Sequence, residues 1–200
     1  KTPPPTVVTT YPYSDSPQPL KPLFFVSFDQ RIDAAAVLEK IQVTAGSEEV
    51  SLVMATQEEI DADKQVSQLA KYAEEGRWLA FRATKPFKPA TTVSVNIPEG
   101  TPSAEGPLTT TGTQSFGFST YYPLEITEHR CGWSDRCPPF SPFYITFNNP
   151  LDLQTFDADM IQVDPEIGTM AVNAYGTTIE IKGETKGQTT YSVTVSGNLR

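Results

Sequence analysis

The fold is decided by Pro22-Leu23-Phe24-Phe25-Val26-Ser27-Phe28, a stretch that recurs as Pro142-Phe143-Tyr144-Ile145-Thr146-Phe147. Each copy runs on to an aspartate, Asp33 or Asp152, and then to an Ile-Gln-Val triplet. The shift from Phe24 to Phe143 is 119 residues, which exceeds the roughly 20 to 50 residues of solenoid repeats. The repeat therefore predicts that a whole domain has been duplicated.

Apolar residues alternate within each copy, as in Phe24, Val26 and Phe28. This is the period of a strand with one buried face. Further short strands, each bounded by Gly, Pro, Asn or Thr, are predicted at residues 79–81, 93–97, 116–118, 179–181 and 191–195. Short strands at this spacing predict an all-β fold of two tandem immunoglobulin-like β-sandwiches.

The predicted domain order is a Pro-rich leader over residues 1–18, a first sandwich over 19–122 and a second over 123–200. The first sandwich carries a predicted helical insertion at about residues 57–76, because early acidic residues favour a helix start and a glycine supplies the stop. The second copy shows no counterpart of the predicted strand at 116–118. We therefore expect it to be truncated at its C-terminus, in a parent chain that continues.

Composition disfavours two classes of partner. Fifteen basic and twenty-four acidic residues give a net charge of −9, which repels nucleic acid. Mean hydropathy is −0.31, and no apolar run approaches the roughly 18 residues of a bilayer helix, so we expect no direct membrane contact. The N-terminus at Lys1 has no apolar signal region, so we expect a signal peptide to be absent or already removed.

Only two cysteines occur, Cys131 and Cys137. Their spacing favours a disulfide that pins the connector between the two sandwiches, and a disulfide would place the chain in an oxidising compartment. Two free thiols are the alternative. His129 and Asp135 could complete a zinc site with these cysteines, but two neighbouring arginines and the nonstandard cysteine spacing disfavour it. We expect no metal and no cofactor.

No pattern typical of catalysis occurs. The chain has one histidine and neither a Gly-x-Ser-x-Gly elbow nor a glycine-rich nucleotide loop, which predicts a protein that is not an enzyme. Asp33 and Asp152 are expected to cap short helical turns, with calcium binding as the alternative. Tyr121, Tyr122 and Trp133 gather near the junction of the two predicted sandwiches. They are candidate contacts between the domains or with a partner.

Two resemblances follow from these stretches. The run from Pro22 to Asp33, followed by Ile-Gln-Val, resembles bacterial immunoglobulin-like modules. The run from Tyr121 through the two cysteines to Asp152 resembles the N-terminal part of bacterial alpha-2-macroglobulin-like proteins. Neither cysteine stands in the Cys-x-Glu-Gln context of that family's thioester.

The second resemblance implies non-catalytic structural modules of a larger peptidase inhibitor that acts as a peptidase trap. It implies a periplasmic or cell-surface location, often with a lipid anchor on the parent chain. The implied partners are other domains of the same chain, and peptidases that the full-length parent meets. The alternative is an immunoglobulin-like binding or spacer module of a bacterial surface adhesin or carbohydrate-processing protein, in which Tyr122 or Trp133 would contact the ligand.

Overall fold

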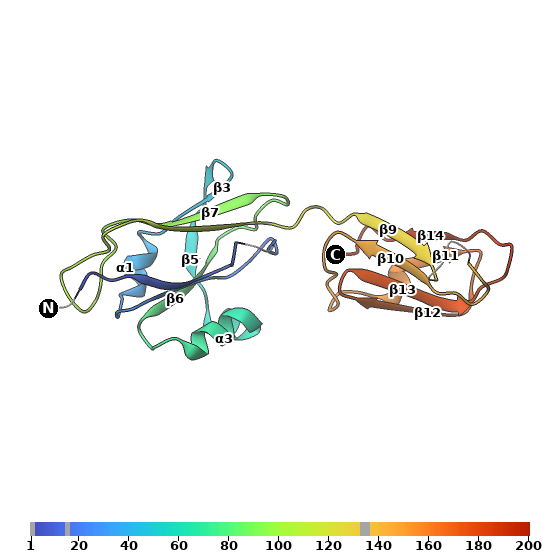
Figure 1. Ribbon diagram of the computed structural model, residues 1–200, viewed down its shortest axis with the longest axis horizontal. Helices are drawn as coiled ribbons and strands as arrows, with labels where there is room; N and C mark the ends of the chain where they lie inside the picture. The colour runs from blue at the N-terminus through green and yellow to red at the C-terminus, as the bar shows by residue number, and fades with distance from the viewer. Residues whose placement is uncertain (1–2, 15–16, 133–136) are drawn as a thin grey trace. The chain divides into compact units, whose positions relative to one another are not determined.

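The computed structural model describes residues 3–14, 17–132 and 137–200 (Figure 1). The chain divides into two compact units, Lys1–Tyr121 and Tyr122–Arg200. Both units consist mainly of antiparallel β-sheets, so the predicted all-β fold of two tandem sandwiches is confirmed.

The first unit is a sandwich of two four-stranded sheets, ordered β1-β2-β6-β5 and β4-β3-β7-β8. The strands of the first sheet are β1 (Val7–Tyr11), β2 (Phe24–Phe28), β6 (Trp78–Ala83) and β5 (Leu52–Met54). Those of the second are β4 (Glu48–Glu49), β3 (Gln42–Ala45), β7 (Thr92–Ile97) and β8 (Gln114–Ser119).

Part of the predicted leader is an edge strand of the first unit. β1 pairs antiparallel with β2, with Val7 opposite Phe28 and Tyr11 opposite Phe25. The run of valine and threonine in β1 is rich in the β-branched residues that strands favour. Because β1 pairs with β2, the first sandwich begins earlier than the predicted residue 19. The Pro-rich composition of residues 1–18 obscures this short strand in the sequence.

The helical insertion consists of two helices, α2 (Gln57–Ala62) and α3 (Lys64–Tyr72). Thr56 and Glu59 form a capping box at the start of α2. The Asp63 carboxylate accepts hydrogen bonds from the first amides of α3. Asp63 has an extended backbone and separates the two helices. A shorter helix, α1 (Ala34–Leu38), begins directly after Asp33, whose carboxylate accepts hydrogen bonds from the amides of Ala35 and Ala36.

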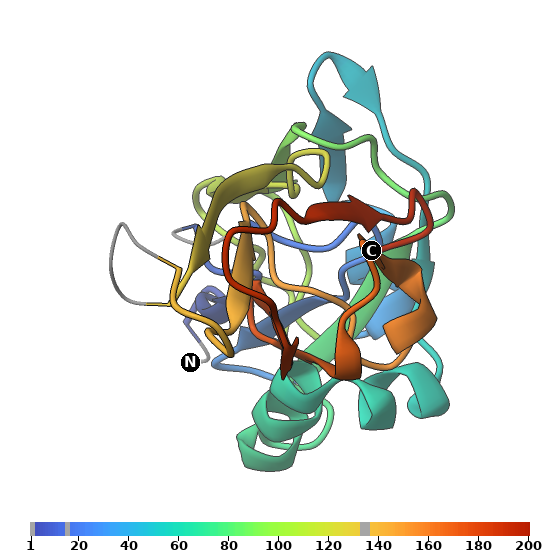
Figure 2. The ribbon, with the colours of Figure 1, turned by 90° about the vertical axis from the view of Figure 1, so that its right-hand side faces the viewer.

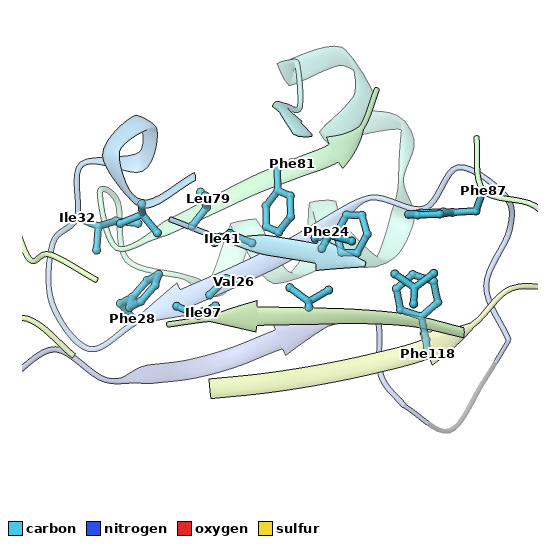
Figure 3. Close-up of a cluster of buried hydrophobic side chains, with 14 residues drawn as sticks. Phe24, Val26, Phe28, Ile32, Ile41, Leu79, Phe81, Phe87, Ile97 and Phe118 are labelled. Carbon is cyan, nitrogen blue, oxygen red and sulfur yellow. The ribbon is translucent and has the colours of Figure 1, made fainter. Parts of the chain in front are cut away.

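Strand β2 is buried on both faces, whereas the alternation in its sequence predicts only one buried face. Phe24, Val26 and Phe28 point into the core between the two sheets (Figure 3). Leu23 and Phe25 instead belong to a second cluster on the outer face, where residues of α2 and α3 cover the sheet. Figure 2 shows this pair of helices, in teal, lying next to each other. The insertion thus gives the first unit a third layer.

The second unit repeats this plan with fewer strands. Its sheets are ordered β12-β13-β10-β9 and β11-β14. A single 3-10 turn, η1 (Ala158–Met160), precedes β11. The strands are β9 (Ile126–Cys131), β10 (Phe143–Phe147), β11 (Ile161–Asp164), β12 (Gly168–Tyr175), β13 (Thr178–Glu184) and β14 (Ser192–Val195).

Strand order and register support the duplication. β10 lies between β9 and β13 as β2 lies between β1 and β6. In the other sheets Val43 pairs with Val95, and Val163 of the matching Ile-Gln-Val triplet pairs with Val193. Among the described residues of the second unit, no strand takes the place that β8 holds beside β7. The two repeated stretches therefore fill equivalent positions in two sandwiches.

Candidate functional site

A disulfide joins Cys131 and Cys137, with their Cα atoms 5.6 Å apart. Cys131 is the last residue of β9 and lies opposite Phe143 of β10. The next residue, Gly132, has a φ of 55° and donates its N–H to the Pro142 carbonyl at 2.8 Å. The bond therefore lies between two neighbouring strands of the second unit. The prediction that it pins the connector between the two sandwiches is wrong, because β9 already belongs to the second sandwich. In the loop-entropy model so short a ring stabilises the fold by roughly 2 to 2.5 kcal/mol.

The aromatic residues predicted as contacts differ in their burial and in their backbone hydrogen bonds. Tyr121 is half-buried, and its backbone N–H donates to the Gln18 carbonyl while its own carbonyl accepts from Ala90. Tyr122 is 63% exposed. Trp133 lies outside the described residues. A contact role for these side chains remains a prediction.

Two asparagines that the sequence did not single out hold the chain where the second unit begins. Asn148 donates its side-chain amide to the Pro123 carbonyl at 2.7 Å and accepts from the Glu125 N–H at 2.9 Å. Asn149 donates to the Tyr122 carbonyl at 2.6 Å. Tyr121 is thus hydrogen-bonded within the first unit, and Tyr122 within the second.

Charged and aromatic side chains form a row across the outer face of the sheet β12-β13-β10-β9. Tyr144 lies opposite Arg130 on one side and Glu180 on the other, and the Arg130 guanidinium is 4.9 Å from the centre of the Tyr144 ring. Glu180 also forms an ion pair with Lys182, with Nζ and Oε2 2.9 Å apart. We call Arg130, Tyr144, Glu180 and Lys182 the outer row. Such cross-strand pairs stabilise a sheet.

The row shifts the ionisation of its members. The hydrogen bond from the Lys182 ammonium lowers the pKa of the Glu180 carboxyl, and the same contact raises the pKa of Lys182. Burial raises the pKa of Tyr144, with a further contribution from Glu180. The phenol therefore stays protonated at neutral pH. The row offers a sheet-stabilising network without an activated nucleophile.

The second unit should lose stability in acid through Glu180. Because the folded-state pKa of Glu180 is lowered, its contribution is present above the unfolded-state value of about 4.3 and is lost as pH falls through the folded-state value. E180Q should flatten the loss of stability between pH 7 and pH 3, as measured by denaturant unfolding with hydrogen exchange at β13. K182M removes the partner and should flatten it similarly. An undiminished acid loss in both variants would contradict this assignment.

A groove of about 590 Å³ lies beside the helical insertion of the first unit. Glu59 and Arg82 line it and form an ion pair with Oε1 and Nε 2.6 Å apart. The backbone N–H of Thr56 lowers the pKa of the Glu59 carboxyl, with a smaller effect from Arg82. These groups fasten α2 to β6, and their charges neutralise each other.

Comparison with known proteins gives one family match. The model of the bacterial Ig-like domain family matches residues 1–120. The chain belongs to the bacterial Ig-like domain family. The match includes β1 and therefore agrees with the observed start of the first sandwich. It supports the resemblance to bacterial immunoglobulin-like modules, and no comparison supports the narrower resemblance to alpha-2-macroglobulin-like proteins.

No curated protein matches this bacterial Ig-like chain. Among solved structures, it is similar to the N-terminal part of the bacterial S-layer protein SbsC, at 12% sequence identity and a TM-score of 0.37. The similarity covers 98% of this chain and 44% of that one, so the Ig-like chain spans less than half of that protein's resolved length.

The two aspartates considered as helix caps or calcium ligands make hydrogen bonds to nearby backbone amides. Asp33 caps α1, and Asp152 accepts a hydrogen bond from the Gln154 N–H at 3.0 Å. Within residues 3–14, 17–132 and 137–200, no three His, Cys, Asp or Glu side chains are grouped so that they could hold a metal ion. None of the helices in these ranges is long and apolar enough to span a membrane.

Proposed function

We propose that the two units are structural spacer modules of a bacterial surface protein. The observation that carries the proposal is the tandem architecture: residues 1–120 match the bacterial Ig-like domain family, and the second unit repeats the same four-strand sheet order. Domains of this family are typically extracellular or exposed at the surface and are typically non-catalytic. A fold alone does not fix a function, so further support must come from the molecule itself.

Two features of the chain support a structural role. In the outer row and beside α2, the side chains with shifted pKa values contact other polar side chains. Glu180 pairs with Lys182 on the same strand and with Tyr144 on the neighbouring strand, and Glu59 of α2 pairs with Arg82 of β6. The disulfide is of the kind that persists in oxidising compartments such as the periplasm or cell exterior. Under this proposal the partners of the two units are other domains of the same chain.

The peptidase-trap interpretation receives no support from the family match, which favours the surface-protein alternative. Incubating the 200-residue chain with a panel of endopeptidases should give no stoichiometric inhibition. Stoichiometric inhibition would favour the peptidase-trap interpretation over the spacer role.

A module exchange tests the spacer role directly. In the protein that carries these residues, residues 1–200, which include the edge strand β1, would be replaced by two unrelated bacterial Ig-like modules of similar length. A spacer predicts that surface display and the parent's activity survive the exchange, whereas deletion of the same residues impairs them. Loss of activity on exchange, with display intact, would show that these modules carry a specific binding surface and would contradict the proposal.

A further inference from the structure

The edge of β14 that faces away from β11 differs from its counterpart in the first unit. In the first unit β7 pairs with β3 on one side and with β8 on the other. In the second unit β14 pairs with β11, and the described residues supply no strand on its other side. Free strand edges present unpaired backbone groups that can accept another strand.

Register identifies the backbone groups on that edge. The Ser196 N–H donates to the Met160 carbonyl, so even-numbered residues of β14 direct their hydrogen-bonding groups toward β11. Because these directions alternate along a strand, the N–H and carbonyl groups of Val193 and Val195 face the open side. Because Val193 corresponds to Val95 in the repeat, Tyr191 corresponds to Val93. In the first unit Val95 lies opposite Phe116 of β8, and Val93 lies opposite Phe118.

The apolar surface beside this edge is also incompletely covered. Val93, Val95 and Ile97 of β7 are fully buried, whereas Val193 and Val195 of β14 are only half-buried. A hollow of about 430 Å³ beside Val193 is lined by Phe143 and Ile145, among other residues. A second hollow, beside Val195, is lined by Phe147 and Leu199, and Ile126 of β9 lines both. The two hollows flank β14 on the side of β9.

We propose that the open edge of β14 is an acceptor site for an extended partner segment of the β8 type, aligned antiparallel to β14. The repeat supplies the chemistry of the occupant. Phe116 and Phe118 of β8 stand opposite the two valines of β7, and Phe118 is buried in the core beside Phe24 and Phe87. The partner segment therefore carries large apolar side chains at alternate positions opposite Val193 and Tyr191, which both line the hollow of about 430 Å³. Its backbone pairs with Val193 and Val195.

A peptide with the sequence of residues 113–120, TQSFGFST, is the matching probe for the intact 200-residue chain. Saturating peptide should slow hydrogen exchange at the amides of Val193 and Val195 about tenfold, as measured by NMR. Amides of β7, whose edge is already occupied by β8, should not change. The matched control is the peptide in which Gly117 and Phe118 are exchanged, since it has the same composition without the alternation.

Binding of the first peptide with clear preference over the exchanged peptide supports the site. V193P removes one outward N–H at an edge position that tolerates proline, and should weaken binding about tenfold while β13 amides stay protected. Absence of any slowing, or equal slowing by both peptides, overturns the proposal. Concentration-dependent protection of the β14 edge without peptide also overturns it, because a second copy of the chain would then be the occupant.

Discussion

Replacing Phe24 by alanine should lower the free energy of unfolding of the first unit by about 3 to 5 kcal/mol. Phe24 is fully buried. Its ring stacks on Phe81 with the ring centres 4.9 Å apart and lies 5.7 Å from Phe118. Figure 3 shows these rings meeting between the two sheets. Truncation removes apolar contacts with both sheets at once and leaves a cavity.

Denaturant unfolding, followed by hydrogen exchange at β2 and β6, measures this loss. The matched control is Y72A, because Tyr72 at the end of α3 is 78% exposed and its truncation should change stability by no more than about 0.5 kcal/mol. Since small domains are stable by only about 5 to 15 kcal/mol, F24A should leave the first unit marginal. Equal stabilities of F24A and Y72A would show that the aromatic stack does not organise this core.

Replacing Gly183 by alanine should destabilise the second unit by up to about 3 kcal/mol, the upper range for overpacking a core. A Cβ at this position of β13 would collide with the Ile167 side chain and stand 2.9 Å from the Gly168 carbonyl oxygen. Ile167 belongs to the core of the second unit and is 3% exposed. Neither the packed side chain nor the backbone can withdraw without disturbing the sheet.

The comparison variant is G197A. A Cβ on Gly197 meets no atom within 4 Å, so this substitution should leave stability nearly unchanged. Thermal unfolding, with hydrogen exchange at β12 and β13 to locate the loss, distinguishes the two variants. If G183A unfolds at the same temperature as G197A, then Ile167 and Gly168 do not pack as closely against Gly183 as the structure shows.

Much of the architecture could be predicted because a duplicated pattern is a strong signal. The matched Phe24 and Phe143 stretches lie in equivalent strands, and the two Ile-Gln-Val triplets pair with equivalent valines. The disulfide was predicted from the cysteine spacing alone. These features depend on local alternation or on the only available partner, so a single sequence suffices to predict them.

Other elements could not be predicted because tertiary partners decide them. β1 is hidden among prolines, and β9 has an exposed, polar sequence that shows no alternating apolar face. Burial of the outer face of β2 depends on helices that lie far along the chain. Of the outer row, Glu180 and Lys182 could have been placed on an outward face, since they alternate with Ile179 and Ile181. Their meeting with Tyr144 required the strand register.

The helical insertion has a consequence for how the two copies diverge. Phe25 of β2 and Tyr144 of β10 occupy equivalent positions in the repeat, as do Ala80 and Glu180 in the neighbouring strands. In the first copy this face is apolar and lies under the helices, whereas in the described residues of the second copy it carries polar side chains and no helix covers it. A lineage that deleted α2 and α3 would expose Phe25 and its stacked neighbour Trp78 to water. Removing the helices without loss of solubility would therefore also require polar replacements on the sheet face that they cover.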